Sequence, residues 1–98
     1  MKTTKEYIEL LQQHKKEYAE NYGITHIGIF GSVARGEQTH ESDIDICFEA
    51  DKIDLFGMGG FMYDLEELLG VRVDIVRMRD NMNSGLKQRI EKDVIYVL

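Results

Sequence analysis

The segment from Gly31 to Gly36 combines residue types that bind a phosphate group. A β-branched run over residues 24–30 precedes it and predicts a strand, and Ser32-Val33-Ala34-Arg35 suits a single helical turn. The first N–H groups of a helical turn lack partners within the turn and attract anions. The Ser32 hydroxyl and the Arg35 guanidinium would add donors for the same anion. The alternative is an ordinary turn in which Ser32 only caps the helix, and a Gly-Ser pair on its own favours it.

Two aspartates follow this turn on a predicted strand. In the run Asp43-Ile44-Asp45-Ile46-Cys47-Phe48 the side chains alternate in character, so Asp43 and Asp45 share one face. Carboxylates two residues apart on a strand can converge on one cation, and their hard oxygen atoms suit Mg²⁺ or Mn²⁺. The alternative is a solvent-facing acidic strand, where charge discourages aggregation.

A third aspartate lies on a later predicted strand. The run Val71-Arg72-Val73-Asp74-Ile75-Val76 alternates in the same way and places Asp74 on the face opposite to Val73 and Ile75. If the two strands are neighbours, about 4.8 Å apart, Asp74 can join Asp43 and Asp45 in one patch. Three carboxylates in one patch require a metal ion or a retained proton. The alternative for Asp74 is a charged residue on the exposed face of a half-buried strand.

Together these features resemble one family. The sequence Gly-Ser-x-Ala-Arg-Gly, then Ser-Asp-x-Asp, then a lone aspartate on a later strand is similar to the minimal nucleotidyltransferase (MNT) members of the DNA polymerase beta-like nucleotidyltransferase superfamily. The resemblance implies that two Mg²⁺ ions, or Mn²⁺, are held by the catalytic residues Asp43, Asp45 and Asp74. It also implies that ATP is bound through its phosphates by Gly31, Ser32, Arg35 and Ser42.

Members of this family are often encoded beside a HEPN-domain toxin and act as its antitoxin. The resemblance therefore implies transfer of AMP from ATP to a hydroxyl group, with a tyrosine of a cognate HEPN toxin as acceptor and assembly with that toxin. One alternative is a non-catalytic antitoxin that neutralises its partner by binding, although the complete set of acids argues against it. Another is transfer to a small molecule, as in aminoglycoside-modifying relatives, which need an additional domain. Metal-dependent glycosyltransferases with Asp-x-Asp are much larger.

Composition narrows the class of protein. The chain has 98 residues, which predicts a single domain over residues 1–98. Its net charge of −6 and the lack of a basic run argue against strong stand-alone binding to nucleic acid. No apolar run approaches the roughly 20 residues that a membrane-spanning helix needs. The single cysteine, Cys47, excludes an internal disulfide, and a reducing cytoplasm is the expected location.

The elements that must position these residues follow from the periodicity. The pattern predicts helices over residues 4–21 and 84–92, the latter capped by Ser84, and strands over 24–30, 43–48 and 71–76, with a short final strand within 93–98. Lys87 and Arg89 are expected to be solvated helix charges, the alternative being contact with a triphosphate. A further helix is expected to begin late, near Gly60, or to be frayed, because each interior glycine costs about 1 kcal/mol. The expected fold is α+β (an α/β sandwich), a small mixed sheet with helices on its apolar face and the acid face open. The resemblance implies the same polymerase beta-like fold.

Overall fold

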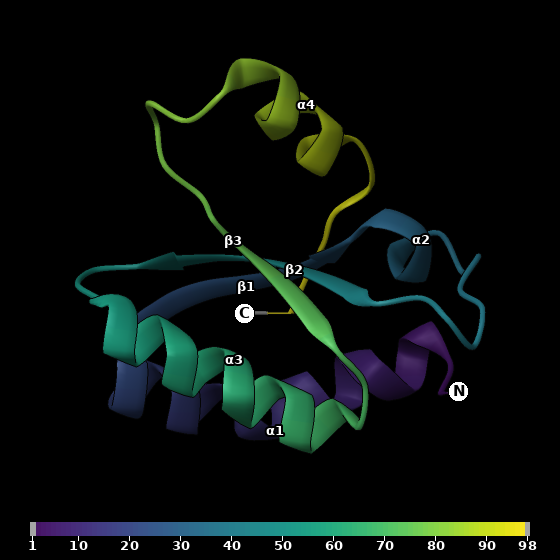
Figure 1. The fold of residues 1–98 in the computed structure, drawn as a ribbon, viewed down its shortest axis with the longest axis horizontal. Coiled ribbons are helices and arrows are strands. Elements are labelled where there is room, and N and C mark those ends of the chain that lie inside the picture. The colour runs from purple at the N-terminus through teal and green to yellow at the C-terminus, as the bar shows by residue number, and fades with distance from the viewer. Residues whose placement is uncertain (1, 98) are drawn as a thin grey trace.

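The computed structural model describes residues 2–97, which form a four-stranded sheet between helices (Figure 1). The strands lie in the order β3-β2-β1-β4; β1 pairs antiparallel with β2 and β4, and β2 pairs parallel with β3. This mixed sheet confirms the predicted α+β class. The elements, in chain order, are α1 (Thr4–Tyr22), β1 (Ile24–Phe30), α2 (Gly31–Ala34), β2 (Ile44–Ala50), α3 (Leu55–Leu69), β3 (Val73–Arg77), α4 (Ser84–Asp93) and β4 (Ile95–Tyr96).

The first helix begins at its predicted residue and ends one residue beyond its predicted limit. The Thr3 hydroxyl accepts the N–H of Glu6, and the Glu6 carboxylate accepts the N–H of Thr3, so two N–H groups at the helix start are satisfied. Gly23 ends α1 in the left-handed conformation, with φ of 69°. No helix within residues 2–97 has the length and apolar character needed to cross a membrane.

The main core lies between the sheet and the pair α1 and α3, which run along the same side of it (Figure 1). Phe61 of α3 is at the centre of this core, with its ring centroid 5.2 Å from that of Phe48 and 5.4 Å from that of Tyr18. The apolar face predicted from the alternation is the one that is buried here. Its sheet residues are Ile27, Ile29, Ile44, Ile46, Val73 and, partly buried, Ile75.

The acid face is only partly open, because α4 lies on the side of the sheet opposite to α1 and α3 (Figure 1), while Asp74 stays exposed. Ile90 of α4 and Cys47 of β2 are fully buried but lie outside the main core. Gly28 makes this close packing possible: a Cβ atom there would lie 2.7 Å from Val94 Cγ2 and 3.0 Å from Cys47 Sγ. The cap of α4 also differs from the prediction, since Asn83, and not Ser84, accepts the N–H of Leu86 at 3.0 Å.

The third helix begins earlier than its glycines predict. Asp54 caps it by accepting the N–H of Gly57 at 2.7 Å, so the helix starts at Leu55. At Gly60 the missing side chain leaves room for the ring of Tyr22, whose hydroxyl donates a hydrogen bond to Asp64 one turn further on. Packing against α1 therefore outweighs the low helix propensity of these glycines.

Candidate functional site

Pairing of β2 with β3 brings together acids that are far apart in the sequence. In this parallel pair Asp45 lies opposite Asp74, and Ile44 lies opposite Val73. Because paired residues point to the same side of a sheet, Asp45 and Asp74 face away from the core that buries Ile44 and Val73. Asp43 comes directly before β2, two residues from Asp45. We call Asp43, Asp45 and Asp74 the acid cluster.

The members of the acid cluster repel one another. Burial is the main reason why the pKa of the Asp45 carboxyl is raised, and the negative charges of Asp74 and then Asp43 raise it further. Arg35 and Arg89 act in the opposite direction. Asp43 also forms an ion pair with the exposed Arg72, whose Nε lies 3.5 Å from a carboxylate oxygen. The cluster is therefore a site of excess negative charge that a cation would neutralise.

As placed, no three His, Cys, Asp or Glu side chains within residues 2–97 form a ready-made metal cage. The donor set of the acid cluster nevertheless fits a hard divalent cation, because it offers only carboxylate oxygens, and the charges of Asp74 and Asp43 add to the effect of burial in raising the pKa of Asp45. Mg²⁺ and Mn²⁺ are the ions that such oxygen ligands select.

The glycine at the end of β1 lies directly against this cluster. Gly31 starts α2 with φ of 74°, a conformation that L side chains rarely adopt, and a Cβ atom on it would overlap the carboxylate of Asp45. Ser32 is the second residue of α2, whose cap position is Phe30 without a side-chain hydrogen bond. The alternative in which Ser32 serves as the helix cap is therefore wrong. We call Gly31, Ser32 and Arg35 the anion turn.

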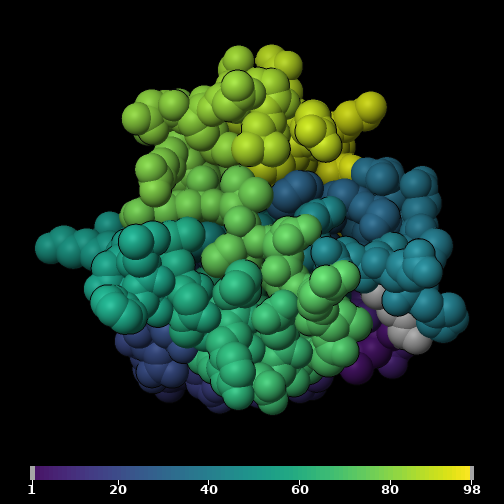
Figure 2. Space-filling model, viewed as in Figure 1, coloured from purple at the N-terminus to yellow at the C-terminus, as the bar shows by residue number. Residues whose placement is uncertain are grey.

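The anion turn and the acid cluster meet at one cavity of about 280 Å³. Asp45 contributes from β2, and α4 supplies the opposite wall. Figure 2 shows the yellow atoms at the C-terminal end of the chain packed beside the blue atoms that follow β1. The cavity is lined by Phe30, Gly31, Ser32, Arg35, Asp45, Leu86, Arg89 and Asp93.

Two of the lining residues, Arg89 and Asp93, were not among the predicted site residues: Arg89 was expected to be a solvated charge, and Asp93 had no assigned role. Arg89 is exposed but turned toward the cavity, where its charge acts on Asp45. Asp93 accepts hydrogen bonds from the backbone N–H of Gly31, at 3.4 Å, and from Arg35 Nη1, at 2.6 Å. Leu86, Arg89 and Asp93 recur at helical intervals of three, four and seven residues, and this shared helix face was the available signal.

The remaining predicted site residues lie outside the cavity wall. The Ser42 hydroxyl accepts the N–H of Thr39 at 2.9 Å, so it closes the loop before β2. Asp43 and Asp74 do not line the cavity, and their charges act on its wall by raising the pKa of Asp45. Asp74 lies on β3, which is an edge strand of the sheet, and its side chain is exposed.

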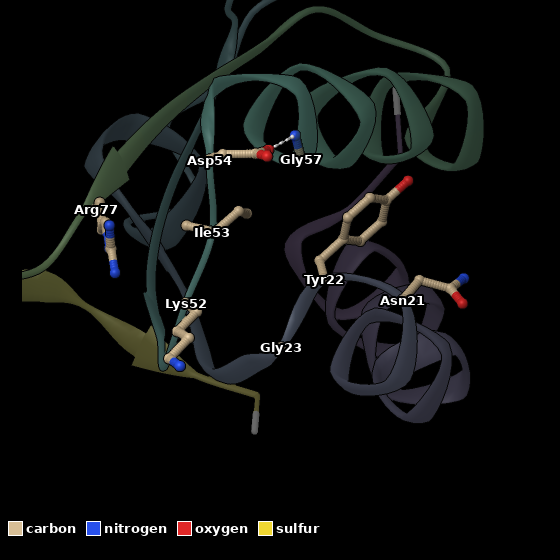
Figure 3. Close-up of a pocket in the computed structure, with 8 residues that line it drawn as sticks. All are labelled: Asn21, Tyr22, Gly23, Lys52, Ile53, Asp54, Gly57 and Arg77. Carbon is tan, nitrogen blue, oxygen red and sulfur yellow. Dashed lines mark hydrogen bonds between the residues drawn. The ribbon is translucent and has the colours of Figure 1, made fainter.

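A larger hollow, of about 670 Å³, lies at the other end of β1 and β2 (Figure 3). None of the predicted site residues lines it. Figure 3 shows Lys52 and Arg77 on one side of this hollow and Tyr22 and Asn21 on the other, with the hydrogen bond between Asp54 and Gly57 drawn. It contains no cluster of acids and no anion turn, so size alone does not indicate the site.

Comparison with known proteins gives consistent matches along the chain. The sequence profile of the nucleotidyltransferase domain matches residues 11–97. Protein adenylyltransferase MntA of Thermococcus cleftensis is 40% identical over 98 residues, which cover 99% of this chain and 98% of that protein. A solved structure described provisionally as a minimal nucleotidyltransferase is 32% identical, with a TM-score of 0.71, over 90% of this chain and 93% of that chain. A chain from a mutant of the toxin–antitoxin pair MntA-HpeT is 25% identical, with a TM-score of 0.66, over 98% of this chain and 72% of that chain.

Proposed function

Because this chain belongs to the nucleotidyltransferase domain family, we propose that its acid cluster and its anion turn transfer AMP from ATP to a hydroxyl group of a protein. The observation that carries the proposal is the register of β2 and β3, which sets Asp45 beside Asp74 while Gly31 touches Asp45 from the other side. The 40%-identical relative named as a protein adenylyltransferase supports a protein as the acceptor.

The triphosphate would bind at the anion turn. The N–H of Gly31, the Ser32 hydroxyl and the Arg35 guanidinium are donors on one side of the cavity, and Arg89 adds positive charge from the opposite wall. A volume of about 280 Å³ is at the lower limit of ligand pockets, so the cavity would enclose the phosphates and leave adenosine at its rim.

The acid cluster would hold the metal ions, with Asp45 between Asp43 and Asp74. When bound there, Mg²⁺ would neutralise phosphate charge and favour ionisation of the attacking hydroxyl. Asp45 has the most restricted position of the three, because Gly31 lies against its carboxylate. Asp43 would exchange its ion pair with Arg72 for this role.

In the transfer step, the acceptor oxygen forms a bond to the α-phosphorus while the bond from that phosphorus to the bridging oxygen breaks. Pyrophosphate leaves, and the hydroxyl proton passes to the carboxylate of Asp74. Because Asp74 lies exposed on an edge strand, a large acceptor can approach it without entering the cavity. This open approach fits a protein acceptor better than a small molecule, which would need further walls to hold it.

We propose a tyrosine of a cognate HEPN toxin as the acceptor. The resemblance to MNT proteins and the likeness to a toxin–antitoxin chain support this partner. The proposal also includes dependence on Mg²⁺. The competing proposal is that the chain neutralises its partner by binding alone. In that case neutralisation would not require the acid cluster.

The test is incubation of the protein with labelled ATP, Mg²⁺ and a candidate HEPN protein from the same organism, followed by mass spectrometry of the modified tyrosine. We expect one or more AMP groups with the native chain and none with Asp45→Asn, whose folding is verified by thermal unfolding. Asp51→Asn, which changes an exposed aspartate just beyond the other end of β2, is the matched control and should keep full transfer. Undiminished modification by the Asp45 variant would refute the assignment. Neutralisation of the toxin by that variant would favour binding alone.

A further inference from the structure

One carboxylate of the chain already occupies the anion turn. Asp93 accepts hydrogen bonds from Gly31 N–H, at 3.4 Å, and from Arg35 Nη1, at 2.6 Å, with one oxygen for each donor. Its side chain is only 18% exposed, whereas that of Arg35 is 46% exposed. Both donors are among those that the proposed function assigns to a phosphate group.

Asp93 has the charge needed to imitate a phosphate. Burial alone would raise the pKa of its carboxyl, but hydrogen bonds from Arg35 and Gly31 outweigh burial and hold that pKa below its usual value. The group is therefore ionised at neutral pH. Asp93 takes the N–H of Gly31 and one N–H of the Arg35 guanidinium, while the exposed Glu37 accepts from Arg35 Nε at 3.2 Å. A phosphate group that uses Gly31 N–H and Arg35 Nη1 must therefore displace Asp93.

Helix stability does not explain an acid at this position. Asp93 is the last residue of α4, where the partial negative charge of the helix end disfavours a carboxylate. The contact with Gly31 and Arg35 does explain it. The backbone beyond Asp93 is fixed, because Val94 N–H bonds to Ile90 and β4 pairs with β1. Only the side chain of Asp93 has to turn for the anion turn to open.

We propose that Asp93 is an intramolecular substitute for phosphate, which ATP must displace on entry and which returns to the anion turn when pyrophosphate leaves. Asp93 thus sets the affinity and specificity of the site for highly charged phosphates. Ligands with little charge cannot displace it, whereas a triphosphate with its metal ion can. This inference rests on the proposed function for the location of the phosphates, but not on the identity of the acceptor.

The test measures binding of Mg²⁺-ATP and of inorganic pyrophosphate by calorimetry to the native chain and to Asp93→Asn, which keeps the shape and removes the charge. We expect both ligands to bind about tenfold more tightly to the variant, because a unit charge within a few ångströms of the phosphates is lost. Glu91→Gln removes the same charge from an exposed position of the same helix and should change neither affinity by more than about twofold. Asp93→Ser is the second variant if the first does not fold.

Equal or weaker binding of pyrophosphate by the folded Asp93 variants overturns the inference, since it would mean that Asp93 only orients Arg35. A gain of the same size in Glu91→Gln overturns it as well. AMP transfer by a native chain whose affinities match those of the variant removes the role of Asp93 and leaves the proposed function intact. Tighter binding by the variant, together with no AMP transfer by the native chain, supports the role of Asp93 and contradicts the proposed function.

Discussion

Gly31 is the point at which the anion turn touches the acid cluster. We predict that Gly31→Ala lowers AMP transfer much more than it lowers stability. The new Cβ would overlap the carboxylate of Asp45, so either the carboxylate or the turn must move. The backbone at Gly31 has φ of 74°, so alanine is also strained there.

The size of each effect can be worked out separately. Left-handed backbone costs an alanine about 1–2 kcal/mol. In a domain of this size that loss lowers the melting temperature by roughly 5–15 °C. The overlap with Asp45 acts on the reaction, because a displacement of about 1 Å in a catalytic group can reduce the rate about 100-fold. We therefore expect a moderately destabilised protein whose transfer activity falls much further than its stability.

The assay compares thermal unfolding with AMP transfer, or with ATP–pyrophosphate exchange, at a temperature where every variant is folded. Gly36→Ala is the matched control, because Gly36 has φ of 71° and no heavy atom within 4 Å of an added Cβ. It should be destabilised to a similar degree but keep most of its activity. Equal activity in the two folded alanine variants would refute the reasoning, since backbone strain alone would then account for the loss.

Three further predictions follow from the acids and the glycines. Asp74→Asn should abolish transfer yet raise the melting temperature of the metal-free protein. Because the folded pKa of Asp45 lies above its unfolded value, native stability should fall as pH rises through that folded pKa, and the variant should show a smaller fall. Chelation of divalent ions should stop transfer, Mg²⁺ or Mn²⁺ should restore it, and each should raise the melting temperature of the native chain but not of Asp74→Asn. Gly59→Ala, in open space, should stabilise α3 by about 0.5–1 kcal/mol in urea unfolding, whereas Gly60→Ala should show no such gain, because its Cβ would lie 3.1 Å from Tyr22 Oη.

Much of the fold could be predicted from local pattern. The range predicted for the first strand matches β1 over Ile24–Phe30, and α1 ends one residue beyond its predicted limit. The alternation around Asp45 and Asp74 predicted which face each acid would take, and the register of β2 with β3 agrees with it. These features depend on the period of the chain and on capping residues, which are local properties.

The features that escaped prediction depend on contacts between distant residues. The start of α3 was misplaced because glycine propensity is a local cost, whereas the space that Gly60 leaves for Tyr22 is a tertiary gain. Arg89 and Asp93 were missed for a similar reason. Their common helix face was visible in the sequence, but only the path of α4 across the sheet brings that face to Asp45.

The parallel pairing of β2 with β3 also determines the order in which the proposed site assembles as the chain is synthesised and folds. All of α3 must be synthesised and docked before Asp74 can pair with Asp45 in the sheet. The helix α4 must then dock before Arg89 and Asp93 complete the cavity. A ribosome-bound chain or a fragment cut between α3 and β3 would therefore carry the glycine–serine motif without Asp74, its proposed catalytic partner. Under the proposed function, catalysis would begin only when the cavity is complete, so its onset during refolding would report the docking of α4 after the edge strand.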